Sequence, residues 1–171
     1  EKYADNADIQ ALASTVKEQW EAYQANPTGY FDSVELMELD TMIGGKGVNN
    51  IELVKTLAGN SADAIEWLST IGADLKNVGQ FGGAAVKRIH RPVNEDGKVI
   101  SVGSYIVPIL EKTVEDRGVE VFYNTTANKI IMKDGKAAGV EAEGKTGNKV
   151  TINAKSVVLA TGGFGANNDM V

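Results

Sequence analysis

One stretch near the end of the sequence constrains the fold more than any other. Residues 156–160 (SVVLA) form a short, almost wholly apolar run, which is typical of a strand buried on both faces of a parallel sheet. Thr161, Gly162 and Gly163 follow at once, and residues 167–169 (NND) offer N-cap residues for a helix. A strand, a glycine turn and the start of a helix predict an α/β fold in which the backbone closely approaches a bulky ligand.

The sequence before this run divides into a helical part and a β part. Apolar residues recur at helical spacing from residue 9 to residue 23, and caps and glycines delimit further helical segments. Later strand-like runs are joined by Asp134-Gly135, a strong hairpin signal, and by residues 145–148. The predicted helices cover residues 9–23, 32–44, 50–59, 61–72 and 104–116, and the predicted strands cover 119–124, 127–133, 137–143, 149–154 and 156–160. Pro108 is expected in the first turn of its helix, because a helix interior does not tolerate proline.

These segments predict an α/β chain, α+β when taken by itself. It has a helical N-terminal half and then part of a Rossmann-like sheet with an inserted three-strand antiparallel meander. We expect one domain with three parts: a helical segment over 1–73, a glycine-rich loop over 74–103 and an α/β segment with the meander over 104–171. A long glycine-rich loop inside a compact domain is uncommon and tends to be functional.

The composition argues against several classes of function. Lys and Arg number 17 against 23 Asp and Glu, and the net charge of −6 disfavours binding to nucleic acid or to a membrane surface. No apolar run approaches the ~18–20 residues that a membrane-spanning helix needs. The sequence has no cysteine and only one histidine, His90, so we expect no metal site and no cysteine nucleophile.

Basic residues gather in one place in this otherwise acidic sequence. Lys87, Arg88, His90 and Arg91 lie within the run GGAAVKRIHRP, residues 82–92. Such a cluster could hold an anionic ligand, because arginine offers planar bidentate donors. It could equally be a solvated turn whose counter-ions are the nearby carboxylates of residues 95 and 96. The residues alone leave both interpretations open.

The terminal glycines do not form the dinucleotide-binding fingerprint. That motif needs three glycines opening a helix, with an acidic residue about 20 positions further on. Here only Gly163, Gly165 and Asn168 fall at the required spacing. By spacing alone, a tight structural turn explains the segment as well as a ligand site does.

Two longer stretches carry a family resemblance. Residues 33–92, from SVELMELDTMIGG to KRIHRP, closely resemble the flavoproteins of the fumarate reductase and succinate dehydrogenase family. They are most similar to the soluble fumarate reductases, which include flavocytochrome c and urocanate reductase relatives. Residues 157–171 (VVLATGGFGANNDMV) resemble the last strand-turn motif of that family before its substrate domain. The resemblance covers residues 33–171, with a more divergent helix before it.

The resemblance implies an FAD-dependent oxidoreductase of which this chain is an internal part of the flavin domain. The parent would transfer a hydride from reduced FAD to fumarate or a similar unsaturated dicarboxylate. The family's N-terminal phosphate-binding turn and its catalytic arginine have no counterpart in this sequence. We therefore expect the chain by itself to have neither stable FAD binding nor activity, and we assign it no catalytic residue.

The resemblance also implies a small set of cofactor-binding residues. Ala127 corresponds to the strand whose backbone holds the adenine end of FAD. Ala160, Thr161, Gly162 and Gly163 correspond to the turn along the adenosine and pyrophosphate groups. Small side chains suit this role, because a larger one would keep the backbone away from the nucleotide.

Several alternatives stay open from the sequence. The parent could be a urocanate reductase or a ketosteroid dehydrogenase, because the segment that selects the substrate is not in this chain. An alternative of another class is a non-catalytic helical module that binds a partner protein. It would bind through the apolar residues that recur at helical spacing over residues 9–23, which we call the 9–23 stripe. The sequence leaves open the electron donor, whether a haem domain, an FMN domain or a quinone-linked partner, and it fits a bacterial cytoplasmic or extracytoplasmic location equally.

Overall fold

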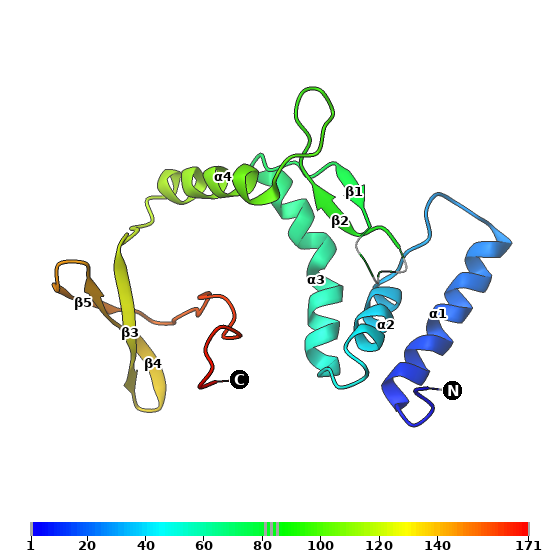
Figure 1. Cartoon of the computed structure of the whole chain (residues 1–171), viewed down its shortest axis with the longest axis horizontal. Helices are drawn as coiled ribbons and strands as arrows, with labels where there is room; N and C mark the ends of the chain where they lie inside the picture. Colours follow the sequence, from blue (N-terminus) through cyan, green and yellow to red (C-terminus); the bar gives the residue numbers. More distant parts are fainter. Residues whose placement is uncertain (1, 81, 83, 85, 171) are drawn as a thin grey trace. The chain divides into compact units, whose positions relative to one another are not determined.

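The computed structural model describes residues 2–80, 82, 84 and 86–170. The chain separates into two compact units, Glu1–Gly118 and Val119–Val171, which we describe one at a time. The predicted division of one domain into three parts, with boundaries after residues 73 and 103, stays a prediction. Figure 1 shows helices and short strands in the first unit and longer strands in the second. In the described ranges, no helix is both long enough and apolar enough to cross a lipid bilayer.

Three helices form the main body of the first unit. They are α1 (Ala7–Ala25), α2 (Val34–Gly44) and α3 (Ile51–Thr70). Each begins at a residue whose side-chain oxygen accepts a hydrogen bond from the first turn: Asn6, Ser33 and Asn50. The helices pack around a buried cluster of Ile9, Leu12, Met42 and Val54, and burial of these apolar side chains holds the helices together.

The predictions for the first two helices are confirmed, but α3 differs from what we expected. We predicted two helices that part near residue 60, and the structure has one helix through this point. Asn60 and Ser61 do not break it because their side chains donate hydrogen bonds back to helix carbonyls, at Thr56 and Ala58 respectively. Residues that often cap a helix thus find hydrogen-bond partners for their side chains in the middle of this one.

Glu38 of α2 is a charged residue that is buried, with 6% of its surface exposed. Burial raises the pKa of its carboxyl above the ordinary value of 4.5, repulsion from Glu35 adds to the rise, and Lys55 opposes it. Because the folded-state pKa is raised, protonation of Glu38 favours the folded state. Its contribution to stability is therefore largest below pH 4.5 and is lost as the pH rises through the raised pKa.

We predict that Glu38→Gln stabilises the chain at pH 7 by about 1 kcal/mol, because the neutral amide avoids burial of a charge. Urea unfolding followed by circular dichroism at pH 7 and pH 4 measures the effect. The gain should shrink at pH 4, where the native carboxyl is more often protonated. Equal or lower stability of the variant at pH 7 would contradict the prediction. Glu66→Gln serves as the control at an exposed position of α3.

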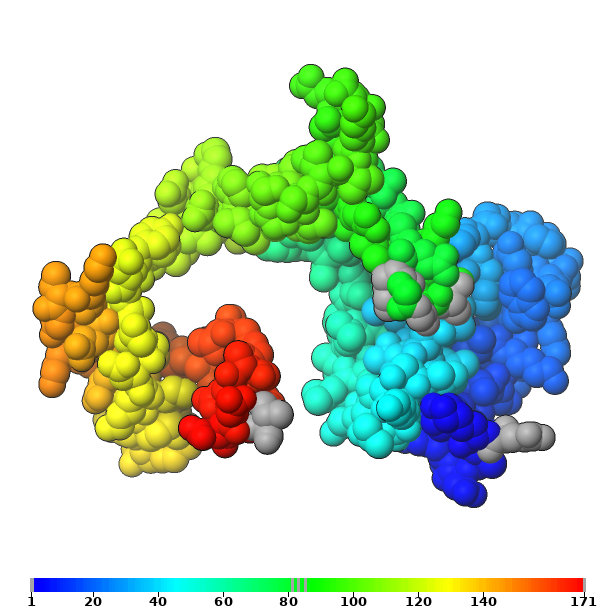
Figure 2. All heavy atoms as spheres, viewed as in Figure 1, coloured from blue at the N-terminus to red at the C-terminus, as the bar shows by residue number. Residues whose placement is uncertain are grey.

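The region predicted to be irregular contains a short hairpin. β1 (Asn77–Gly79) and β2 (Ile89–Arg91) pair antiparallel, with Val78 opposite His90. A further turn is closed by the bridge between Val93 and Val99, and it projects from its unit in Figures 1 and 2. Phe81, Gly83 and Ala85 of the glycine-rich loop lie outside the described residues.

α4 (Val102–Asp116) ends as predicted, next to Gly118 with a positive φ of 65°. Pro108 lies well inside the helix and not in its first turn, which corrects our prediction. The N–H that proline lacks would have paired with the carbonyl of Ser104, and both residues are exposed to solvent. Water can reach that carbonyl, which explains why the helix continues through the proline.

The second unit is built on the predicted meander. β3 (Thr125–Lys133), β4 (Lys136–Gly144) and β5 (Lys149–Asn153) form an antiparallel sheet in the order β3-β4-β5. Asp134 and Gly135 have φ values of 50° and 75°, as the tightest hairpin turns require. This part of the sequence prediction is confirmed.

Two predicted strands are not strands in the structure. Residues 119–124 and 156–160 have no assigned strand or ladder partner among the described residues. Val158 and Leu159 are 86% and 70% exposed, although their run is typical of a strand buried on both faces. A parallel strand forms only beside a neighbouring strand, and the described residues offer these two runs none.

Candidate flavin-nucleotide site

Ala127 lies on a strand whose outer edge is open. Because β3 is the first strand of the sheet, one row of its backbone N–H and C=O groups has no strand partner in the described part of the chain. Ala127 is exposed, and it pairs with Ala142 of β4 on the inner side. A flat ring with donors and acceptors along one edge could therefore hydrogen-bond to the backbone here without a large side chain in the way.

The turn at residues 160–163 is also exposed along its whole length. Gly162 has a φ of 80°, a conformation that glycine adopts without strain. A Cβ atom added at Gly162 or Gly163 would meet no heavy atom within 4 Å, so open space borders the backbone of both residues. This main chain can be approached closely by a bulky group.

The predicted site residues all belong to the unit Val119–Val171. Among the residues that the structure describes, no hydrogen bond joins Ala127 to the 160–163 turn. Each segment separately fits its predicted role, because each presents small side chains and accessible backbone. The adenine and pyrophosphate contacts of FAD are compatible with these residues.

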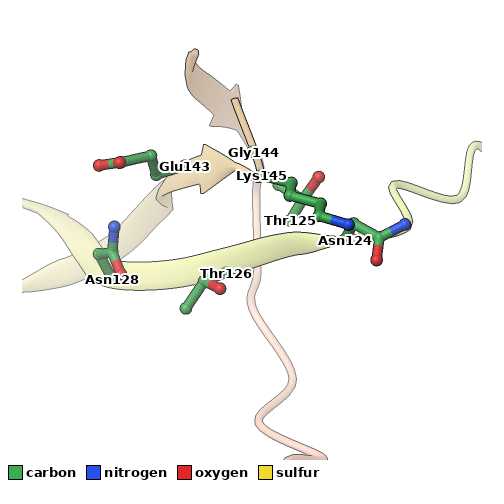
Figure 3. A pocket seen from close by; sticks show the side chains of 7 residues that line it. All are labelled: Asn124, Thr125, Thr126, Asn128, Glu143, Gly144 and Lys145. Atoms are coloured by element: carbon green, nitrogen blue, oxygen red, sulfur yellow. The ribbon is translucent and has the colours of Figure 1, made fainter. Parts of the chain in front are cut away.

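Next to Ala127 the β3–β4 pair carries a polar hollow of about 610 Å³. Figure 3 shows its lining side chains. They come from the start of β3 and the end of β4: Asn124, Thr125, Thr126, Asn128, Glu143, Gly144 and Lys145. Asn124 has a φ of 51°, and its carbonyl accepts a hydrogen bond of 2.9 Å from the Lys145 N–H, which joins the start of β3 to the end of β4. These polar residues, Ala127's neighbours on β3 and β4, were not among the site residues predicted from the sequence.

One residue of the basic cluster, Arg88, forms ion pairs within the chain. Arg88 donates to both carboxylate oxygens of Asp32, at distances from 2.7 to 3.2 Å, and to the Asp40 carboxylate at 2.7 Å. Its side chain is 11% exposed. The counter-ions of Arg88 are therefore Asp32 and Asp40 and not Glu95 and Asp96, which corrects the solvated-turn interpretation for this residue.

The other basic residues have different surroundings. The Lys87 backbone N–H donates to the Tyr30 hydroxyl, and the His90 Nδ1 lies 3.3 Å from the Leu75 carbonyl oxygen. Arg91 lies opposite Asn77 in the β1–β2 pair. Anion binding by these three side chains stays a prediction.

The ion pairs also control the protonation of Arg88. Burial by itself would lower the pKa of its guanidinium, but the hydrogen bonds to Asp32 and Asp40 outweigh burial and raise the pKa. Arg88 is therefore a permanent cation held between two carboxylates. Its ion pairs link the residue just before β2 to α2 through Asp40, and to the connection before α2 through Asp32.

The chain is similar in sequence and in fold to fumarate reductases. The sequence is 39% identical over 141 residues to a fumarate reductase (cytochrome) of Shewanella frigidimarina, which covers 82% of this chain and 24% of that protein. The fold matches the open conformation of a flavocytochrome c3 fumarate reductase with a TM-score of 0.73 and 39% identity, over 90% of this chain and 26% of that one. The chain thus spans about a quarter of the length of these relatives.

A second structural match is more distant. The 3-ketosteroid-Δ4-(5α)-dehydrogenase from Rhodococcus jostii RHA1 has a TM-score of 0.62 and 26% identity, over 83% of this chain and 35% of that one. The matches confirm the predicted α/β flavoprotein fold class and the resemblance to fumarate reductase flavoproteins. The family model described as "FAD binding domain" matches residues 20–171. The chain therefore belongs to the FAD-binding domain family, as the part found in fumarate-reductase-like flavoproteins.

Proposed function

We propose that this chain supplies the surface that holds the adenosine half of FAD. Ala127 offers its backbone to the adenine, and Ala160, Thr161, Gly162 and Gly163 lie along the adenosine and pyrophosphate groups. The observation that carries the proposal is the exposed backbone at these small residues, on an open strand edge and in a glycine turn. FAD, when bound, supplies the hydride chemistry.

For the whole protein we propose hydride transfer from reduced FAD to fumarate or a similar unsaturated dicarboxylate. The identity to a fumarate reductase over 82% of this chain supports this substrate class. A ketosteroid dehydrogenase is the second candidate, supported by the structural match to one such enzyme. A urocanate reductase is a third, within the same resemblance. In each case the role of this chain is to bind and orient the cofactor.

A helical module that binds a partner through the 9–23 stripe has less support. Ile9 and Leu12 lie in the core of the first unit, and Trp20 and Tyr23 pack against Phe31 with ring centroids 5.1 and 5.3 Å from it. Most of the stripe is therefore engaged within the chain. This arrangement favours the flavoprotein proposal.

Ala127→Leu tests the proposed adenine contact. We expect the variant to weaken binding of ADP, which carries the adenosine and pyrophosphate groups of FAD, at least about tenfold, because the larger side chain covers the backbone beside the open edge. Saturation-transfer NMR with ADP at millimolar concentration measures the loss. Lys133→Leu, at an exposed position of the same strand, is the matched control. Equal ADP binding by the Ala127 variant and the wild type would refute the contact.

A further inference from the structure

A hollow with an apolar floor lies within the first unit, where α2, α3 and residues 87–90 meet. It measures about 540 Å³, a volume typical of small-molecule sites. Apolar side chains of the two helices form its floor, among them Val34, Met37, Leu57 and Ile65. Val34 and Leu57 are 44% and 57% exposed. An apolar molecule in the hollow would cover these side chains, and removing apolar surface from water favours binding.

Most polar groups of the hollow already have partners within the chain. The Arg88 guanidinium is paired with carboxylates, that of Asp32 among them. The Ser33 hydroxyl donates one hydrogen bond at 2.7 Å and accepts another at 3.1 Å. The His90 Nδ1 lies 3.3 Å from a backbone carbonyl oxygen. These side chains hold the polar end of the hollow together.

Lys87 differs from these residues. Its side chain lines the hollow, and within the described residues its amine has neither a hydrogen bond nor an ion pair. The hollow therefore combines an apolar floor with an unpaired cation. An ammonium group donates hydrogen bonds and accepts none, so the complementary group is an acceptor with a negative charge.

We propose that this hollow binds a small monocarboxylate with an apolar tail, such as a medium-chain fatty acid. The carboxylate pairs with Lys87, and the tail covers Val34 and Leu57. A dicarboxylate suits the hollow less, because its second charge would lie against the apolar floor without a partner. The hollow shares no residue with the predicted nucleotide-binding set, which belongs entirely to the second unit, so the inference does not rest on the proposed function.

Amide NMR of the isotope-labelled full chain tests this assignment with octanoate, hexanoate, octanol and octylamine as probes. We expect octanoate to shift the amides of Ala58, Ala62 and Lys87, which line the hollow. Hexanoate should bind about tenfold more weakly than octanoate, because it lacks two methylene groups that the floor would cover. Octanol should bind about fivefold more weakly than octanoate, the most that an exposed ion pair contributes. Octylamine should bind least, because its cation would meet Lys87.

Two substitutions with matched controls examine the tail and the head group separately. Ala62→Phe fills the hollow from an exposed position of α3 and should abolish the octanoate shifts, whereas Ala13→Phe, exposed on α1, should leave them unchanged. Lys87→Gln should weaken octanoate binding about fivefold, to the level of octanol. Its control is Lys98→Gln, which changes an exposed lysine outside the hollow. The Lys87 amine has no partner in the fold, so its loss should not affect stability.

The inference is supported if octanoate binding depends on chain length, on Lys87 and on the space beside Ala62. Equal binding of octanol and octanoate, or unchanged octanoate binding by Lys87→Gln, would overturn the assignment of a carboxylate to Lys87. Octanoate shifts that persist in Ala62→Phe would place the ligand elsewhere, and no shift with any probe would refute the site itself. ADP binding at Ala127 is a separate measurement, so each of these results leaves the proposed function standing.

Discussion

Arg88→Ala is expected to lower the free energy of unfolding of the first unit by about 3–5 kcal/mol. The substitution removes a guanidinium that is 11% exposed and that pairs with the Asp32 and Asp40 side chains, which are 30% and 20% exposed. It also removes the ion pairs that link the residue just before β2 to α2 and to the connection before α2. Urea unfolding followed by circular dichroism measures the loss.

Two further variants identify the cause of this loss. Arg88→Lys keeps the charge but cannot reproduce the three hydrogen bonds to Asp32 together with the one to Asp40, so it should restore only part of the stability. Lys112→Ala removes an ion pair with Asp116 in which both side chains are more than 60% exposed, and it should change stability by less than about 1 kcal/mol. If Arg88→Ala costs no more than Lys112→Ala, the three-residue ion pair does not hold the first unit together.

Gly139→Ala should have the second-largest effect, on the meander. A Cβ at this position would lie 2.2 Å from the Ile152 carbonyl oxygen and 3.1 Å from the Asn153 Cα, which are backbone atoms of the neighbouring strand. Such a clash cannot be relieved by rotating a side chain. We expect β4 and β5 to separate locally at a cost of about 3 kcal/mol.

Hydrogen exchange locates this effect within the chain. The amides that join β4 to β5 should lose protection in Gly139→Ala, and those of α2 and α3 should keep it. Gly163→Ala is the matched control, because a Cβ at Gly163 meets no heavy atom within 4 Å. Unchanged protection of the β4–β5 amides in the Gly139 variant would show that the two strands do not approach as closely as described.

The parts of the fold that depend on local sequence signals could be predicted. The N-caps at Ser33 and Asn50, the turn at Asp134-Gly135 and the glycine after α4 act within a few residues of where they stand. The α3 helix was predicted as two because Gly59 is typical of a helix end and Ser61 of a helix start. Whether such a residue caps a helix or bonds back to it depends on the surrounding packing, which sequence spacing does not reveal.

Features that depend on distant residues could not be predicted. The partners of Arg88 lie 48 and 56 positions away along the chain, so the carboxylates near it in sequence misled the interpretation of the cluster. The 156–160 run reads as a buried strand, yet its state depends on whether neighbouring strands are present. The bulge at Asn128 arises from the register of β3 against β4, and an alternation pattern does not encode a one-residue shift.

Amide mapping by NMR with the two halves of FAD tests the central claim most directly. The labelled chain is titrated with ADP and, separately, with FMN at millimolar concentration. We predict that ADP shifts the amides of Ala127 and the 160–163 turn, that FMN leaves them unchanged, and that whole FAD binds only weakly. Shifts at these amides with FMN and not with ADP, or with neither ligand, would contradict the account.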